Sequence, residues 1–179
     1  MLVLLDRDGV LNENRDDYVK SPGELVMLPG AAQAVARLNG AGHHVAICTN
    51  QSAVGRGIVQ PAMLERIHET LREHLARAGA RIDLLLACTD PPWAASDRRK
   101  PGPGMLQEAM RQFRVGPHDT VMIGDDLVDL QAAMRAGIRR ILVRTGKGRK
   151  TQAAGIPAEV LPVAVHDDLA AAVASLLGA

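Results

Sequence analysis

Short apolar runs alternate with amphipathic segments along this chain. The apolar runs stop abruptly at polar residues, which is typical of parallel strands that are covered on both faces. Between them, apolar residues recur at helical spacing, as Leu64, Ile67 and Leu71 do. Strands that alternate with helices predict an α/β domain of three layers, with a parallel, Rossmann-like sheet flanked by helices through right-handed crossovers.

The pattern assigns residue ranges to these elements. The predicted strands cover residues 2–5, 44–48, 82–88, 121–123 and 141–143, with a weaker edge strand within 160–165 that Pro162 interrupts. The predicted helices cover residues 31–38, 61–78, 103–113, 127–136 and a final segment through Leu177 that Asp167 and Asp168 precede as caps. Long polar segments at 13–28, 89–102 and 144–155 are predicted as loops. No segment between the predicted strands is long enough to form a second, separate cap domain, so we predict a single domain over residues 1–179.

Composition limits the classes of function. With 179 residues and 47% hydrophobic content, the chain is long enough for one full core. A net charge of +1 and 2% aromatic residues argue against nucleic-acid and membrane partners. Cys48 and Cys88 lack the spacing of a zinc knuckle or redox pair and are predicted as buried, reduced thiols. We therefore expect a soluble cytoplasmic monomer.

Two acids end the first apolar run. Asp6 and Asp8 are two residues apart, and Gly9 follows them. Such a pair of carboxylates repels itself unless a cation or a proton lies between them. An Asx turn that closes the strand is the structural alternative. Residues later in the chain have to decide between the two.

Polar residues follow the other predicted strands as well. The carboxyl edge of the sheet would carry Asp6, Asp8, Thr49, Asn50, Arg99, Lys100, Asp125, Asp126 and Asp129. Converging carboxylates suit Mg²⁺, and a free carboxylate beside it can attack phosphorus. A hydroxyl, an amide and an ammonium group can hold the phosphoryl oxygens. Each residue has a structural alternative as a cap or a solvated charge, but four strand ends that agree favour phosphoryl transfer.

The predicted helix at 61–78 also carries two histidines, His68 and His74. Their sequence neighbours Glu65, Arg72 and Glu73 are charged. A histidine among such residues belongs more often to a solvated face than to a metal site. We therefore predict that both histidines face solvent.

Four motifs resemble those of haloacid dehalogenase superfamily phosphatases, in the order of that family. They are DRDGVLN at 6–12, TNQS at 49–52, RKPGPGM at 99–105 and GDDLVD at 124–129. The resemblance covers residues 2 to about 148. More narrowly, the motifs are similar to those of the heptose-bisphosphate phosphatase family, whose relatives include histidinol-phosphate phosphatases. The resemblance implies a Mg²⁺-dependent hydrolase that removes the C7 phosphate of a heptose 1,7-bisphosphate, in the synthesis of the lipopolysaccharide core.

The resemblance also implies residue roles. Asp6 would be the nucleophile that forms an aspartyl phosphate, and Asp8 would protonate the leaving alkoxide and then activate water. Mg²⁺ would be held by Asp6, the backbone carbonyl of Asp8 and Asp125, with Asp129 orienting them from behind. The groups that stabilise the phosphoryl would be Thr49 and Lys100. Substrate-binding positions would be Asn14, Arg15, Asp16, Asp17, Asn50, Gln51, Ser52, Arg56, Arg99 and Asp126.

Two departures from the family pattern stand out. Where the family has a zinc loop, only Cys88 is a cysteine, and the other ligand positions are Asp90, Ser96 and Arg98. One thiolate cannot build a tetrahedral site, so no structural Zn²⁺ is expected. Asp126 also stands where the family often has a lysine that meets substrate phosphate.

Three arginines near the motifs indicate the kind of substrate. Arg56, Arg98 and Arg99 offer guanidinium forks that suit a second phosphate, which favours a sugar bisphosphate over histidinol phosphate or another small phosphomonoester. A nucleic-acid 3′-phosphatase fits poorly with the neutral charge and the few aromatic residues. A phospho-receiver signalling module is a remote alternative, because a receiver has its lysine after the last of these strands, whereas here it follows the third. Stable phosphorylation at Asp90 would favour the receiver.

Overall fold

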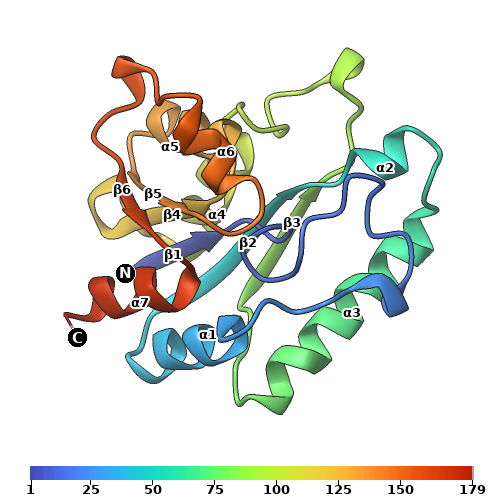
Figure 1. The fold of residues 1–179 in the computed structure, drawn as a ribbon, viewed down its shortest axis with the longest axis horizontal. Helices are drawn as coiled ribbons and strands as arrows, with labels where there is room; N and C mark the ends of the chain where they lie inside the picture. The colour runs from blue at the N-terminus through green and yellow to red at the C-terminus, as the bar shows by residue number, and fades with distance from the viewer. Residues whose placement is uncertain (179) are drawn as a thin grey trace.

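The computed structural model describes residues 1–178 and contains one parallel sheet flanked by helices (Figure 1). Its strand order is β3-β2-β1-β4-β5-β6. The strands are β1 (Leu2–Leu5), β2 (His44–Asn50), β3 (Leu84–Cys88), β4 (Thr120–Gly124), β5 (Arg139–Val143) and β6 (Ala164–His166). The predicted three-layer α/β fold is confirmed. The order changes direction at β1, and ligands bind at such switch points at the carboxyl edge of a sheet.

Helices cover both faces of the sheet. They are α1 (Ala31–Gly40), α2 (Ser52–Gly55), α3 (Pro61–Arg77), α4 (Gly104–Phe113), α5 (Leu127–Arg135), α6 (Gly148–Ala153) and α7 (Leu169–Leu177). Buried side chains of α1, α3 and α7 share one core cluster, and those of α4 and α5 share a second one. In Figure 1, α1, α3 and α7 accordingly lie on the opposite side of the sheet from α4 and α5.

The central strand β1 explains the continuous apolar run at the start of the chain. Val3 and Leu5 belong to the core on the α1, α3 and α7 side, whereas Leu2 and Leu4 belong to the core on the α4 and α5 side. All four side chains are completely buried. Since successive side chains alternate between two covered faces, no position in this strand is polar. The strand is a rigid base for the two acids that come after it.

Most predicted elements are present, with differences at the weaker ones. The helix α6 lies within the segment predicted as the loop 144–155, and α2 directly follows β2. The edge strand begins after Pro162, at Ala164. Asp168 caps α7 by accepting a hydrogen bond from the backbone N–H of Ala171 at 2.8 Å. Cys48 and Cys88 are buried free thiols, as predicted.

The prediction for His68 is wrong. This residue is completely buried, because it shares the inner face of α3 with Leu64, Ile67 and Leu71. His74, which lies further along the same helix, is partly exposed. Among the described residues, no helix combines the length and apolarity required to cross a membrane.

Candidate active site

The polar residues that follow β1, β2, β3 and β4 meet in a cavity of about 370 Å³ at the carboxyl edge of the sheet. The loop after β1, the start of α5 and the segment that follows β5 complete its wall. The lining residues are Asp6, Asp8, Asn14, Arg15, Asp16, Tyr18, Val19, Asn50, Gln51, Ser52, Arg56, Arg99, Lys100, Asp125, Asp126, Val128 and Lys147. The structure therefore brings together most residues that the sequence indicated.

Asp6 is held in one orientation at the end of β1. Its backbone N–H donates to the carbonyl of Ile123 at 3.0 Å, which continues the pairing with β4. Its Oδ1 accepts from the backbone N–H of Arg7 at 2.7 Å and lies 3.1 Å from Nζ of Lys100. Both contacts fall on Oδ1, which leaves Oδ2 as the oxygen with which to attack an electrophile or bind a cation.

Three carboxylates and one ammonium group form what we call the carboxylate cluster: Asp6, Asp125, Asp129 and Lys100. The three acids each offer an oxygen within 4.8 Å of the other two. Nζ of Lys100 lies 2.6 Å from Oδ1 of Asp129 and both side chains are buried. Burial by itself lowers the pKa of Lys100, but Asp129 and Asp6 raise it above its ordinary value, so the ammonium group stays charged.

One ammonium group does not neutralise this cluster. Burial, together with the nearby carboxylates of Asp129 and Asp6, raises the pKa of Asp125 to about 8. A carboxyl group with such a pKa indicates uncompensated negative charge in a region of low dielectric. Oxygen ligands with excess negative charge are what a hard divalent cation such as Mg²⁺ requires. The residues present therefore fit the metal that the motifs imply.

Glycines make room for this cluster. A Cβ atom at Gly9 would lie 2.0 Å from Oδ2 of Asp125, and one at Gly146 would lie 2.1 Å from the same oxygen. Both glycines also have positive φ angles, +82° and +53°. Only glycine combines that backbone conformation with so close an approach. Gly9 therefore belongs to the motif because Asp125 lies against its Cα.

Asp129 is occupied on both oxygens. Oδ1 pairs with Lys100, and Oδ2 accepts a hydrogen bond from the backbone N–H of Asp126 at 3.1 Å as part of a capping box at the start of α5. Asp125 receives the backbone N–H of Lys147 on Oδ2 at 2.7 Å. These contacts make Asp129 better placed to fix Lys100 and α5 than to coordinate a metal ion directly.

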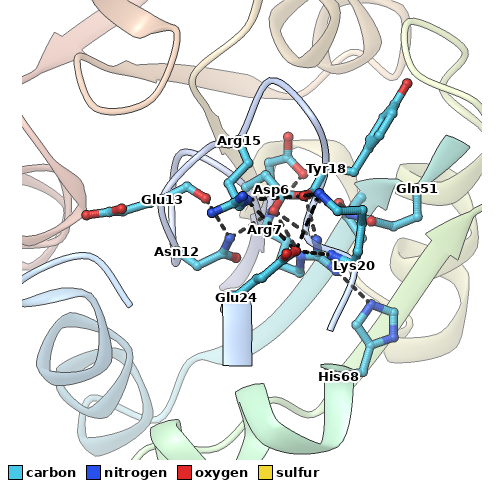
Figure 2. Close-up of polar contacts among 12 residues, drawn as sticks. Asp6, Arg7, Asn12, Glu13, Arg15, Tyr18, Lys20, Glu24, Gln51 and His68 are labelled. Atoms are coloured by element: carbon cyan, nitrogen blue, oxygen red, sulfur yellow. Dashed lines mark hydrogen bonds and ion pairs between the residues drawn. The ribbon is translucent and has the colours of Figure 1, made fainter. Parts of the chain in front are cut away.

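The carboxylate of Asp8 points to a different set of partners from those of the carboxylate cluster. Nη2 of Arg7 donates to both of its oxygens at 2.9 Å, Asn12 donates to Oδ1 and Gln51 to Oδ2, each at 2.8 Å. Burial raises the pKa of Asp8, but these partners outweigh it, and the net effect lowers the pKa below its usual value. Figure 2 shows the polar network around Arg7.

Asn50 and Thr49 organise the second strand end. Asn50 exchanges two hydrogen bonds with the backbone of Lys100, one from its Nδ2 at 2.9 Å and one to its Oδ1 at 3.0 Å. Thr49 is buried beside the cavity and its hydroxyl oxygen accepts from Nε2 of Gln51 at 2.9 Å. The TNQS segment thus fixes both the backbone that carries Lys100 and an amide that contacts Asp8.

Two charged residues lie away from the cavity. Asp17 is exposed and pairs with Nζ of Lys20 at 2.5 Å, outside the cavity wall. Arg98, which the sequence grouped with Arg56 and Arg99, instead pairs with Glu108 on α4. Of the three arginines, the structure places only Arg56 and Arg99 at the cavity.

The 89–102 loop is held by hydrogen bonds at positions where the family pattern has metal ligands. Oδ2 of Asp90 accepts from the backbone N–H of Ser96 at 2.9 Å and from its hydroxyl at 2.5 Å. Nη1 of Arg99 donates to the carbonyl of Asp90 at 2.9 Å. The guanidinium of Arg56 lies 5.1 Å from the centre of the Trp93 ring, which joins this loop to the segment after α2.

Sequence reasoning missed Lys147. Its Nζ lies 2.9 Å from Oδ2 of Asp126, at the cavity wall. Nearby, the hydroxyl of Thr145 donates to the carbonyl of Gly9 at 2.6 Å and ties this segment to the first motif. The signal was available, because a glycine- and lysine-rich segment directly follows β5 at the same edge of the sheet. The sequence does not say which of its residues folds back over the site.

Comparisons with known proteins agree with this geometry. Residues 97–172 match the HAD-hydrolase-like family model. D-glycero-beta-D-manno-heptose-1,7-bisphosphate 7-phosphatase from Pseudomonas putida is 40% identical over 98% of this chain and 99% of its own. The same enzyme from Bordetella bronchiseptica is 43% identical over 98% and 97%. The crystal structure of D,D-heptose 1,7-bisphosphate phosphatase from B. bronchiseptica, complexed with magnesium and phosphate, superposes with a TM-score of 0.94, covers 99% of this chain and 98% of its own, and is 43% identical.

Proposed function

The chain belongs to the heptose-1,7-bisphosphate 7-phosphatase family of haloacid dehalogenase-like hydrolases, and on that premise we propose that it removes the C7 phosphate of D-glycero-D-manno-heptose 1,7-bisphosphate. The observation that carries this proposal is the carboxylate cluster, in which Asp6 and Lys100 face one cavity with Asp125. The similarity to phosphatases over nearly the full length of the chain argues against the phospho-receiver alternative. The names of the relatives from P. putida and B. bronchiseptica specify the β-anomer of the heptose bisphosphate. We therefore propose the β-anomer as the preferred substrate.

In the first step, Oδ2 of Asp6 attacks phosphorus and the bond between phosphorus and the C7 oxygen breaks. Because its partners lower the pKa of Asp8 in the free protein, Asp8 must take up a proton when the negative phosphate groups of the substrate bind beside it and raise that pKa. It then gives this proton to the C7 oxygen, so that heptose 1-phosphate leaves as an alcohol. In the second step, Asp8 takes a proton from water, the water oxygen attacks the aspartyl phosphate, and inorganic phosphate and free Asp6 result. The same carboxyl group thus serves as acid and then as base.

The surrounding residues hold charge during these steps. The ammonium group of Lys100 lies beside Asp6 and stabilises the oxygens of the transferring phosphoryl group. Asp6, Asp125 and the backbone carbonyl of Asp8 would hold Mg²⁺, whose positive charge would let the carboxylate of Asp6 and the phosphate group, both anions, approach each other. Asp129 keeps Lys100 and the start of α5 in place.

The wall of the cavity supports a bisphosphate. Arg56, Arg99 and Lys147 line it, and each carries a positive charge that suits the phosphate on C1. We propose that Asn14, Arg15, Asp16, Ser52 and Asp126 contact the sugar hydroxyl groups. In contrast, the position of Asp17 outside the cavity gives no support for a direct contact with substrate.

The test is phosphate release by the purified protein from both anomers of the heptose bisphosphate and from histidinol phosphate, with Mg²⁺ or with EDTA. We expect Mg²⁺-dependent turnover of the β-anomer, with ³¹P NMR showing loss of the C7 phosphate and retention of the C1 phosphate. The Asp6→Asn variant serves as the inactive control. Preferred turnover of histidinol phosphate would overturn the proposed substrate and leave the chemistry intact.

A further inference from the structure

Arg7, which stands between Asp6 and Asp8 in the sequence of the first motif, has a buried cationic side chain. It is completely buried, and its side chain is among the largest of the interior. Nη2 binds both oxygens of Asp8 at 2.9 Å, and Nε lies 3.3 Å from Oδ1 of the same carboxylate. These contacts use one side of the guanidinium fork. The remaining side, Nη1, faces away from the cavity toward α3.

His68 receives that remaining side. Its Nε2 lies 3.3 Å from Nη1 of Arg7, across 61 residues of sequence (Figure 2). An arginine only donates hydrogen bonds, so Nε2 must be the acceptor and the proton of a neutral imidazole must sit on Nδ1. Burial and the charge of Arg7 also lower the pKa of His68 to about 3. The charged groups near the ring are thus Arg7, Arg72 on the same helix, Asp8, and the exposed Glu65, whose Oε1 lies 4.0 Å from Nδ1.

We propose that His68 is a positioning residue for the reaction: as a neutral acceptor on α3 it fixes the guanidinium of Arg7, which in turn orients the carboxyl group of Asp8 for proton transfer. This inference rests on the proposed role of Asp8. The site offers the physical reason, because the core packing of α3 fixes His68, whereas Arg7 has several rotatable bonds. A ring anchored on a helix therefore selects one of the orientations open to the guanidinium.

The second ring nitrogen of His68 is not hydrogen-bonded in the described part of the chain. Among residues 1–178, its Nδ1 has no hydrogen-bond partner. Leaving a buried donor unpaired costs stability. A leucine of similar volume on the apolar inner face of α3 would avoid this cost, yet the chain has a histidine there. The contact with Arg7 is the feature of the site that a leucine cannot provide.

The variants His68→Leu, His68→Gln and His68→Asn separate this role from simple packing. Leucine removes the acceptor, glutamine places an amide oxygen near the position of Nε2, and asparagine carries its oxygen closer to the helix. We expect kcat/KM for the heptose bisphosphate to fall about tenfold in the leucine and asparagine variants, and to recover most of that loss in the glutamine variant. The KM should change less than kcat. His74→Leu makes the same change on the same helix and should leave both parameters unchanged.

The leaving group provides a second readout. An alkoxide needs the proton of Asp8, whereas 4-nitrophenolate leaves without one, so kcat/KM for 4-nitrophenyl phosphate should fall by less than about twofold in His68→Leu. An equal loss on both substrates, or full activity in a folded leucine variant, would overturn the proposal. If the leucine variant does not fold, the asparagine and glutamine variants decide, and equal activity of these two would overturn it. An inactive wild-type protein would instead refute the proposed function.

Discussion

The carboxylate cluster, which includes Lys100, and the preceding loop residues 90–98 lie at the same edge of the sheet, but they are built in opposite ways. In the cluster, the side chains of Lys100 and Asp129 are 1% and 0% exposed, and the ammonium group of Lys100 compensates part of the negative charge. In the loop, Asp90 is partly exposed, Ser96 is exposed, and hydrogen bonds join the two within a short stretch of chain. A buried charge that loses its partner costs several kcal/mol, whereas an exposed polar contact exchanges with water at little cost. Chemistry and stability are therefore linked in the cluster and separable in the loop.

The largest expected effect is on the activity of Asp6→Asn. We expect kcat to fall at least about 10⁴-fold, because an amide cannot form the acyl phosphate. The variant should stay folded, since one of three mutually repelling carboxylates becomes neutral while Asp129 still pairs with Lys100. Phosphate release and thermal unfolding measure the two quantities. Residual activity above about a hundredth of wild type would show that Asp6 is not the nucleophile.

Lys100→Met comes next, because it affects both activity and stability. The substitution keeps an unbranched side chain close to the length of the lysine's carbon stem and leaves three carboxylates without their ammonium partner. We expect a loss of about 3 kcal/mol in the free energy of unfolding and of about 10²-fold in kcat. Urea unfolding without Mg²⁺ measures the first. A loss below about 1 kcal/mol would mean that the cluster relaxes and takes up protons at little cost.

The sequence predicted this cluster because each part of it has a local signature. The apolar run that ends at Asp6 defines a buried strand, and the residues that come directly after parallel strands gather at one edge of the sheet. The strand ends thus indicated that Asp6 and Asp125 would meet, whereas Lys100 lies further along the loop after β3 and its role was implied by the motif at 99–105. The sequence did not indicate how Asp8 is held, because the bond from Arg7 to His68 joins segments 61 residues apart.

The buried position of His68 follows from the apolar pattern of α3. It lies four residues after Leu64 and three before Leu71, so helical spacing alone places it on the inner face of α3. Charged sequence neighbours outweighed that signal in the prediction, although the side chains of Glu65, Arg72 and Glu73 are exposed while His68 is buried. Lys147 had a weaker signal, since only the folded chain shows that its segment returns to Asp125.

Arg99→Ala has a smaller expected effect and sharpens the distinction between the cavity wall and the rest of the loop. We expect kcat/KM for the heptose bisphosphate to fall about tenfold or more, mainly through KM, if the guanidinium of Arg99, which lines the cavity, binds the C1 phosphate as proposed. Arg98→Ala is the matched control, since the neighbouring arginine pairs with Glu108 outside the cavity. Equal effects of the two variants would mean that only the local potential matters. An unchanged kcat/KM in Arg99→Ala would remove the main support for a bisphosphate.

Asp90→Ala has the smallest expected effect and bears most directly on how the loop keeps its shape. Asp90 accepts two hydrogen bonds from Ser96, and its carbonyl accepts one from Arg99, which the substitution retains. Because the lost contacts are exposed, we expect the melting temperature to fall by less than about 4 °C and KM to rise about twofold, with kcat unchanged. Differential scanning calorimetry and steady-state kinetics measure these changes. A loss of stability as large as that of Lys100→Met would show that the loop, although exposed, supports the fold as much as the buried cluster does.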